Sequence, residues 1–147
     1  IGSSLRSGDG LLVGFDLKKD LSVLRRAYDD SQGVTREFNF NLLDRLNREL
    51  GADFDRRKFV HHCEYNAAVS RMESWLISTQ TQVVNFASLG CCFPFAPWEG
   101  IRVECSYKYD VPQIEALAAA SGFRAQRHFF DSKRYFVDSL WRVRATV

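Results

Sequence analysis

The spacing of apolar side chains changes twice along this sequence, and the order of these changes restricts the folds open to the chain. Residues 11–17 (LLVGFDL) form an apolar run interrupted only by Asp16, apolar residues recur at helical spacing within residues 20–50, and alternation begins at residue 59. A continuous apolar run is typical of a strand buried on both faces of a parallel sheet, whereas alternation is typical of half-buried antiparallel strands. We therefore expect an α/β domain interrupted by an insertion of helices and an antiparallel meander.

Two helices are predicted before the alternating region. Asp20 is suited to cap a first helix, in which Leu21, Leu24 and Tyr28 recur on one side. Thr35 is predicted to cap a second helix that ends at Gly51.

The remaining elements follow from alternation and from turn residues. We expect a meander of three strands, a connecting loop, a further strand, a helix opened by Asp110 and Pro112, and a final hairpin. The meander covers residues 59–65, 71–78 and 82–87, the loop 88–100, the strand 101–109, and the hairpin 124–130 and 134–143.

The strand at residues 101–109 (IRVECSYKY) separates its side chains by type. Successive side chains of a strand point to opposite faces, so Ile101, Val103, Cys105, Tyr107 and Tyr109 are expected on one face. Arg102, Glu104, Ser106 and Lys108 are expected on the other. An ordinary strand with one wetted face would show the same pattern.

Composition excludes several classes of function. The chain has 147 residues, of which 46% are hydrophobic. Its 20 basic and 18 acidic residues nearly balance, so its charge gives no reason to expect nucleic-acid binding. No apolar run reaches the roughly 18 residues of a membrane span, and the four cysteines indicate free thiols, so we expect a cytoplasmic protein. The sequence begins at Ile1 without a methionine, which suggests a piece of something longer.

The segment His61-His62-Cys63-Glu64 contains several metal-ligand residue types. On a strand these side chains would alternate between faces, so a single ion would not collect all four. We predict no metal site.

Four segments of the sequence resemble the histidine N-alpha-methyltransferases of ergothioneine biosynthesis, which depend on S-adenosylmethionine. They are GLLVGFDLKKD at 10–20, AYDDSQGVTREFNFNLLDRLNRELGADFD at 27–55, the YN and RMESW block at 65–75, and IRVECSYKYD at 101–110. The resemblance implies the later half of a Rossmann-like methyltransferase core with an inserted acceptor-binding domain. The implied domains are residues 1–18 (partial core), 19–108 (insertion) and 109–147 (C-terminal helix and strands of the core).

The resemblance also implies site residues. Glu104 and Ser106 match the pair of residues that binds the substrate imidazole in the family. Tyr28 matches a tyrosine that hydrogen-bonds the substrate, and Thr35 matches a threonine near the same cleft. A core tyrosine is the alternative for Tyr28, because Leu21, Leu24 and Tyr28 form an ordinary apolar stripe. Methyl transfer depends mainly on positioning, so we assign no catalytic residue.

The sequence departs from the family pattern in the donor site and at one acceptor position. Gly2 begins a turn that only starts like the family's cofactor-binding turn, and no glycine-rich turn follows an opening strand. We therefore expect the N-terminal remainder of the same enzyme to be a partner in binding S-adenosylmethionine. Ser74 stands where the family usually has methionine beside the imidazole, and a plain surface serine is the alternative there.

Three functions remain open. The first is methylation of the alpha-amino group of histidine, giving trimethylated histidine. The second keeps the donor but uses another amino acid, such as tryptophan or a modified histidine. Ser74 favours this second function, whereas Glu104 with Ser106 disfavours it. The third is a non-catalytic fragment that binds an amino acid.

Overall fold

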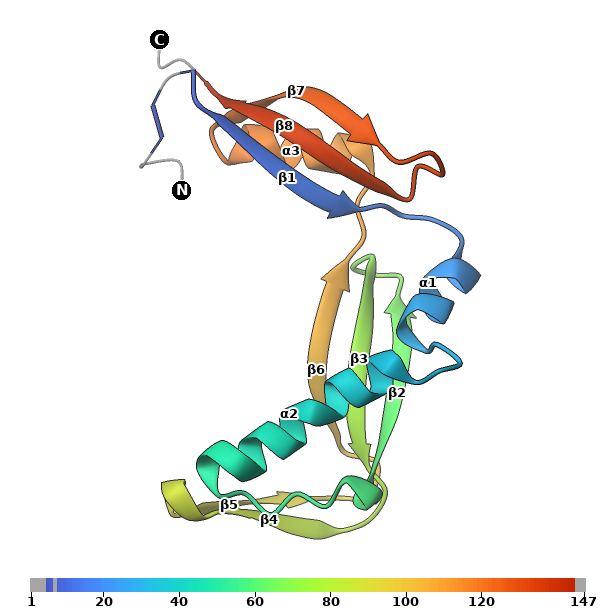
Figure 1. Ribbon diagram of the computed structural model, residues 1–147, viewed down its shortest axis with the longest axis vertical. Helices are drawn as coiled ribbons and strands as arrows, with labels where there is room; N and C mark the ends of the chain where they lie inside the picture. The colour runs from blue at the N-terminus through green and yellow to red at the C-terminus, as the bar shows by residue number, and fades with distance from the viewer. Residues whose placement is uncertain (1–4, 7, 145–147) are drawn as a thin grey trace. The chain divides into compact units, whose positions relative to one another are not determined.

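The computed structural model describes residues 5–6 and 8–144, and the chain forms two compact units (Figure 1). The first unit combines the residues through Lys19 with those from Tyr107 onward, and the second is Asp20–Ser106. The chain therefore leaves the first unit after Lys19 and returns to it at Tyr107. Gly2, predicted as a cofactor contact, lies outside the described residues.

The first unit is a three-stranded antiparallel sheet with one helix against it. Its sheet order is β1-β8-β7, and its helix packs through Ile114 and Ala118 onto Val137 and Trp141 of the sheet. Its elements are β1 (Gly10–Asp16), α3 (Val111–Ala120), β7 (Phe123–Phe130) and β8 (Phe136–Val143).

The pairing of β1 differs from the prediction. β1 is antiparallel to β8, from Gly10 opposite Arg142 to Asp16 opposite Phe136. Leu12 is 61% exposed, because α3 covers only one face of this sheet within the described part of the chain. The prediction of a parallel strand buried on both faces was therefore wrong for these residues.

The start of α3 was predicted correctly. The Asp110 side chain accepts a hydrogen bond from the Gln113 backbone, and the Gln113 side chain accepts one from the Asp110 backbone. This reciprocal capping box satisfies two backbone donors that the first helical turn leaves free.

The second unit places two helices against a three-stranded sheet and adds a two-stranded ribbon (Figure 1). The α2 side chains Phe40 and Leu43 share a buried core with Phe59, Leu76 and Val84 of the strands. The elements are α1 (Leu21–Tyr28), α2 (Val34–Leu50), η2 (Arg56–Lys58), β2 (Phe59–Asn66), β3 (Arg71–Ser78), β4 (Gln82–Phe86), η3 (Ala87–Leu89), β5 (Cys91–Phe95) and β6 (Gly100–Tyr107).

Of the two N-caps predicted for the helices of this unit, one was correct and one was wrong. Asp20 caps α1 as predicted, since its side chain accepts from the backbone of Ser22 and Val23. Thr35 does not cap α2; Gly33 holds the cap position, and Asp30 accepts from the backbone N–H groups of Val34 and Thr35 at 2.9 and 3.0 Å. An earlier carboxylate therefore performs the role predicted for the threonine.

The predicted meander is only half correct. β2 and β3 form the expected hairpin, but β3 pairs next with β6, and β4 pairs with β5 inside the predicted loop. The backbone of Ser78 explains the switch: its N–H donates to Glu99 O at 2.8 Å, and its carbonyl accepts from Trp98 N at 2.7 Å. The chain just before β6 thus occupies the position at the end of β3 that β4 would need in a meander.

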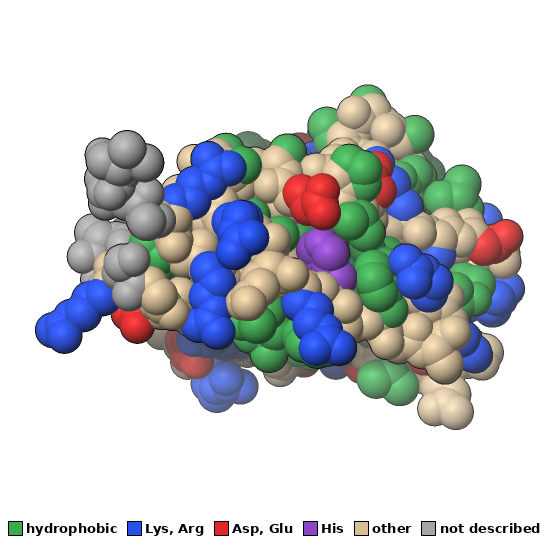
Figure 2. Space-filling model, turned by 90° about the horizontal axis from the view of Figure 1, so that it is seen from above, with side chains coloured by type: hydrophobic (Ala, Val, Ile, Leu, Met, Phe, Trp, Pro, Cys, Tyr) green, Lys and Arg blue, Asp and Glu red, His purple; other side chains and the backbone are tan. Residues whose placement is uncertain are grey.

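Basic side chains are spread over the face of the molecule shown in Figure 2, among hydrophobic and neutral side chains and with few acidic ones. In the first unit, Arg124 lies directly opposite Arg142 across β7 and β8, a like-charge pair that costs stability. Arg142 offsets this cost by donating to the Gln126 side chain and to the carbonyl of Gly8, each at 2.8 Å.

Candidate functional site

All five predicted acceptor-site residues lie in the second unit, on α1, α2, β3 and β6. Tyr28 is the last residue of α1, and Thr35 lies in the first turn of α2. Ser74 is in the middle of β3, and Glu104 and Ser106 are in the C-terminal half of β6.

Tyr28 and Thr35 are held close together by the connection between the two helices. The Thr35 hydroxyl donates to the carbonyl of Ala27, the residue before Tyr28, at 3.2 Å. Asp30 fixes the intervening loop through two backbone hydrogen bonds, which also lower the pKa of its carboxyl. The side chain of Thr35 therefore joins α2 to the last turn of α1.

Tyr28 and Ser74 are both next to one small buried cluster. This cluster consists of Leu24, Cys63 and Met72, and Tyr28 packs against it. Ser74 lies directly opposite Cys63 in the β2–β3 hairpin. The structure therefore brings Tyr28, Thr35 and Ser74 to the side of the sheet that the helices cover.

Ser74 is completely buried, so the prediction of a surface serine as the alternative was wrong. Its Oγ atom has no hydrogen-bond partner among the described residues. A buried hydroxyl without a partner costs free energy and is rare in folded proteins.

The burial of β6 side chains changes phase along the strand. Ile101 and Val103 pack against the core of the second unit, while Arg102 is exposed and lies over the Trp75 ring. From Glu104 onward the order reverses. The half-buried residues are now Glu104 and Ser106, and the exposed ones are Cys105 and Tyr107.

The apolar face predicted for this strand is therefore partly buried only in its first half, since Cys105 and Tyr107 are exposed. Val103 and Glu104 are adjacent and both partly buried. Beyond this point Glu104 and Ser106 are half-buried, and the thiol of Cys105 between them is exposed.

The prediction missed a polar pair that lies one helical turn after Thr35. Asn39 is 4% exposed, and its amide nitrogen lies 3.0 Å from His61 Nε2. Because the amide donates, His61 accepts at Nε2 and carries its proton on Nδ1. Burial also lowers the pKa of His61. The pair of an asparagine on α2 and a histidine on β2 was hidden by their separation in sequence.

The segment around His61 was weighed above as a metal site. Within residues 5–6 and 8–144, no group of three or more histidine, cysteine or acidic residues is placed to hold a metal ion. His62 and Glu64 face each other at 3.9 Å on an exposed part of β2, whereas Cys63 is buried.

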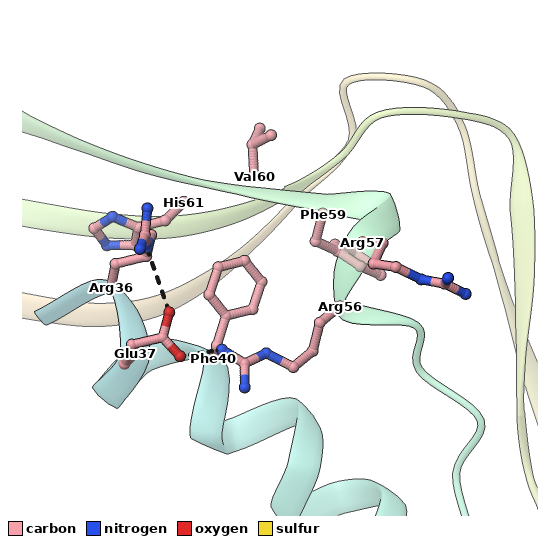
Figure 3. Close-up of a pocket in the computed structure, with 8 residues that line it drawn as sticks. All are labelled: Arg36, Glu37, Phe40, Arg56, Arg57, Phe59, Val60 and His61. Carbon is pink, nitrogen blue, oxygen red and sulfur yellow. Dashed lines mark hydrogen bonds and ion pairs between the residues drawn. The ribbon is translucent and has the colours of Figure 1, made fainter. Parts of the chain in front are cut away.

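A hollow of about 450 Å³ lies between the start of α2 and the start of β2 (Figure 3). Its guanidinium groups already have carboxylate partners: Arg56 pairs with Glu37 and Asp44, and Arg57 pairs with Asp55. An anion entering this hollow would compete with these pairs, so the hollow lacks an open anion subsite. The residues that line it are Arg36, Glu37, Phe40, Arg56, Arg57, Phe59, Val60 and His61.

The described residues do not form a binding site for the methyl donor. Gly8 precedes β1 and Gly10 is its first residue, so neither follows the strand, and β1 leads through residues 17–20 directly into α1. A dinucleotide-type site needs a glycine-rich turn between a strand and a helix. We therefore assign no donor contact to the described part of the chain.

Comparison with known proteins identifies related sequences. A family described as "Histidine-specific methyltransferase, SAM-dependent" matches residues 1–143. Proteins named histidine N-alpha-methyltransferase from Mycolicibacterium smegmatis and Mycobacterium tuberculosis are 42% and 41% identical over 88% and 92% of this chain. Ergothioneine biosynthesis protein 1 of Schizosaccharomyces pombe is 24% identical over 83% of the chain, which covers 16% of that protein.

The chain spans 40% and 42% of the lengths of the two bacterial relatives. In the described residues, no helix is both long and apolar enough to cross a membrane.

Proposed function

Because this chain belongs to the S-adenosylmethionine-dependent, histidine-specific methyltransferases, we propose that it supplies the acceptor site of an enzyme that methylates the alpha-amino group of histidine. The observation that supports the proposal is that Glu104 and Ser106 are half-buried on β6, while Cys105 and Tyr107 beside them are exposed. The proposed product is trimethylated histidine. The names of two relatives, histidine N-alpha-methyltransferase and ergothioneine biosynthesis protein 1, support histidine as the acceptor and ergothioneine biosynthesis as the pathway.

The imidazole ring of histidine fits the polar groups of this strand. A carboxylate accepts a hydrogen bond from a ring N–H, and a hydroxyl donates to the other ring nitrogen. Glu104 and Ser106 provide these two groups from alternate positions of one strand. Tyr28 is proposed to bond the same substrate from the end of α1, with Thr35 holding that helix end in place.

The proposed role of these residues is to orient the substrate. S-adenosylmethionine, when bound, supplies an electrophilic methyl group on a sulfonium. Holding the imidazole at one end of the substrate aims the neutral amine at the other end, and exclusion of water preserves this geometry. No residue of the chain is proposed as a general base.

The first unit is proposed to be part of a Rossmann-like core, with the second unit as an inserted acceptor-binding domain. The proposed boundaries are residues 1–18, 19–108 and 109–147. Two features support an incomplete core within the described residues. Only one face of the β1-β8-β7 sheet has a helix, and β1 has a strand neighbour only on its β8 side. The N-terminal remainder of the enzyme would cover these surfaces and hold most of the donor.

We also propose a cytoplasmic location for the enzyme. Cys63, Cys91, Cys92 and Cys105 are all free thiols. Free thiols are characteristic of a reducing compartment.

The test is Glu104→Ala in the full-length enzyme, with methylated products followed by mass spectrometry. Losing a hydrogen bond to a charged group costs about 1.5–3 kcal/mol, so kcat/KM for histidine should fall at least about tenfold. Glu64→Ala is the matched control, because that carboxylate is 55% exposed on β2. A Glu104→Ala enzyme with wild-type kcat/KM would remove Glu104 from the site.

One observation favours a second acceptor. Ser74 is smaller than the methionine that the family usually has at this position, which would leave room for a larger acceptor such as a modified histidine or tryptophan. The same mass spectrometry on a mixture of amino acids separates the two. Histidine carrying one to three added methyl groups supports the first function, and methylated tryptophan with unmodified histidine supports the second.

A non-catalytic fragment that binds an amino acid is the remaining alternative. Its test is calorimetry of this chain with S-adenosylhomocysteine and with histidine, followed by the full-length enzyme. Donor binding restored only in the longer protein supports the divided core.

A further inference from the structure

Asn39 is a buried polar residue of α2 whose side chain reaches the sheet. It is 4% exposed, and its amide nitrogen lies 3.0 Å from Nε2 of His61 on β2. The imidazole of His61 lies over the start of α2 (Figure 3). Burying an amide costs free energy unless it is hydrogen-bonded, and a leucine would fill a similar space without this cost. The polar pair therefore needs an explanation beyond packing.

On α2, Asn39 is one turn away from a threonine that already holds the neighbouring helix. Thr35 and Asn39 are four residues apart, so their side chains lie on the same side of the helix. The Thr35 hydroxyl donates to the carbonyl of Ala27 at 3.2 Å, and Ala27 precedes Tyr28, the last residue of α1. The start of α2 and the end of α1 are therefore joined on the side of α2 that carries Asn39.

On β2, His61 is two residues away from a side chain that lies next to Tyr28. His61 and Cys63 occupy alternate positions of the strand, so they project to the same face. Cys63 belongs, with Leu24 and Met72, to the buried cluster against which Tyr28 packs. One face of β2 therefore bonds to α2 through His61 and supports Tyr28 through Cys63.

We propose that the Asn39–His61 hydrogen bond fixes the start of α2 relative to β2 and thereby places the hydroxyl of Tyr28 for the substrate, which makes Asn39 and His61 positioning residues. The contacts form a closed ring. It runs from Tyr28 through Cys63 to His61 on β2, and from Asn39 through Thr35 back to the end of α1. The apolar contacts of α2 with the sheet are not directional, whereas a hydrogen bond restricts both distance and angle. The inference rests on the proposed function of Tyr28 and adds residues that act through it.

The informative variants, all in the full-length enzyme, are Asn39→Leu, His61→Leu and His61→Gln. The two leucine variants each remove one partner of the hydrogen bond. His61→Gln keeps the bond, because the side-chain oxygen of glutamine can accept from Asn39 in place of Nε2. Asn47→Leu is the matched control at the other end of α2, where the Asn47 amide donates to and accepts from the backbone of Phe54, at 2.8 Å in both directions.

The expected result for Asn39→Leu and His61→Leu is a rise of about fivefold in KM for histidine, the size of effect that follows from losing one neutral hydrogen bond to the substrate. KM for S-adenosylmethionine should change less than about twofold, because no donor contact is assigned to these residues. His61→Gln and Asn47→Leu should keep KM for histidine near the wild-type value. A fraction of unfolded enzyme lowers the apparent kcat but not KM, so a general loss of folding would not produce this pattern.

Three outcomes would overturn the inference. They are a wild-type KM for histidine in Asn39→Leu, an equal rise in Asn47→Leu, and a rise in His61→Gln as large as that in His61→Leu.

A double mutant shows whether Asn39 acts through Tyr28. Tyr28→Phe removes the hydroxyl and keeps the ring that packs against the buried cluster. Adding Asn39→Leu to Tyr28→Phe should raise KM for histidine by less than about twofold further, whereas independent effects would multiply to about 25-fold. If Tyr28→Phe alone keeps the wild-type KM, the proposed function of Tyr28 fails. If Tyr28→Phe raises KM and Asn39→Leu does not, only the present inference fails.

Discussion

Ser74 and Cys63 lie directly opposite each other in the β2–β3 hairpin, and the Ser74 hydroxyl is buried there without a hydrogen-bond partner in the described residues. Because the folded chain gains nothing from this hydroxyl, we expect Ser74→Ala to leave the free energy of unfolding unchanged or to raise it by up to about 1 kcal/mol. Chemical denaturation of the full-length enzyme measures this. KM for the acceptor should rise in the same variant if the hydroxyl meets the substrate.

Ser78 provides the control for that prediction on the same strand. It is equally buried, but its hydroxyl donates to the Gln80 carbonyl at 2.8 Å and accepts from the Gln82 amide at 2.6 Å. Ser78→Ala should therefore lower the free energy of unfolding by about 1–3 kcal/mol. Equal losses in the two alanine variants would show that Ser74 has a partner in the folded protein.

Gly51 ends α2 in a left-handed conformation with φ of 60°. A side chain there is strained by about 1–2 kcal/mol, and a Cβ atom would also approach the Cβ of Ala87 to 3.2 Å. We expect Gly51→Ala to destabilise the full-length enzyme by more than about 1 kcal/mol in denaturant titrations.

Gly90 separates the two contributions at Gly51. Its φ is 61°, but a Cβ atom would meet nothing within 4 Å. Gly90→Ala should therefore show only the backbone strain. If Gly90→Ala proves as costly as Gly51→Ala, the contact with Ala87 contributes nothing.

Local features of the fold were predictable from the sequence. Asp20, Gly51 and Asp110 each act on backbone groups within a few residues, so their capping roles can be recognised from neighbouring positions alone. Thr35 failed as a predicted cap because Asp30, five residues earlier, reaches the same backbone groups.

The sheet pairing was less predictable because it depends on distant segments. Strand β4 follows β3 after a short turn, yet residues near 98 take its place beside Ser78. The exposure of Cys105 and Tyr107 was missed for a related reason: which parts of a strand face are covered depends on the segments that pack against it. For the candidate site, the resemblance supplied Tyr28 and Thr35, while the contact of Asn39 with His61 required the packed structure.

The burial of His61 predicts a pH dependence of stability. Desolvation lowers the pKa of His61 below its ordinary value of 6.5, so the unfolded chain takes up a proton at higher pH than the folded chain does. The stability associated with neutral His61 is therefore complete above about pH 6.5 and declines as the pH falls toward the lowered pKa. Thermal unfolding of the full-length enzyme at several pH values between about 5 and 8 should show this decline.

His61→Gln should reduce that decline, because glutamine can still accept a hydrogen bond from Asn39 but does not take up a proton in this range. His62→Gln is the control: its side chain is 52% exposed, and His61 remains in that variant to produce the pH dependence. A His61→Gln enzyme whose unfolding temperature falls with pH as steeply as wild type would assign the dependence to other groups. In that case the hydrogen bond between Asn39 and His61 would contribute to packing but not to the pH dependence of stability.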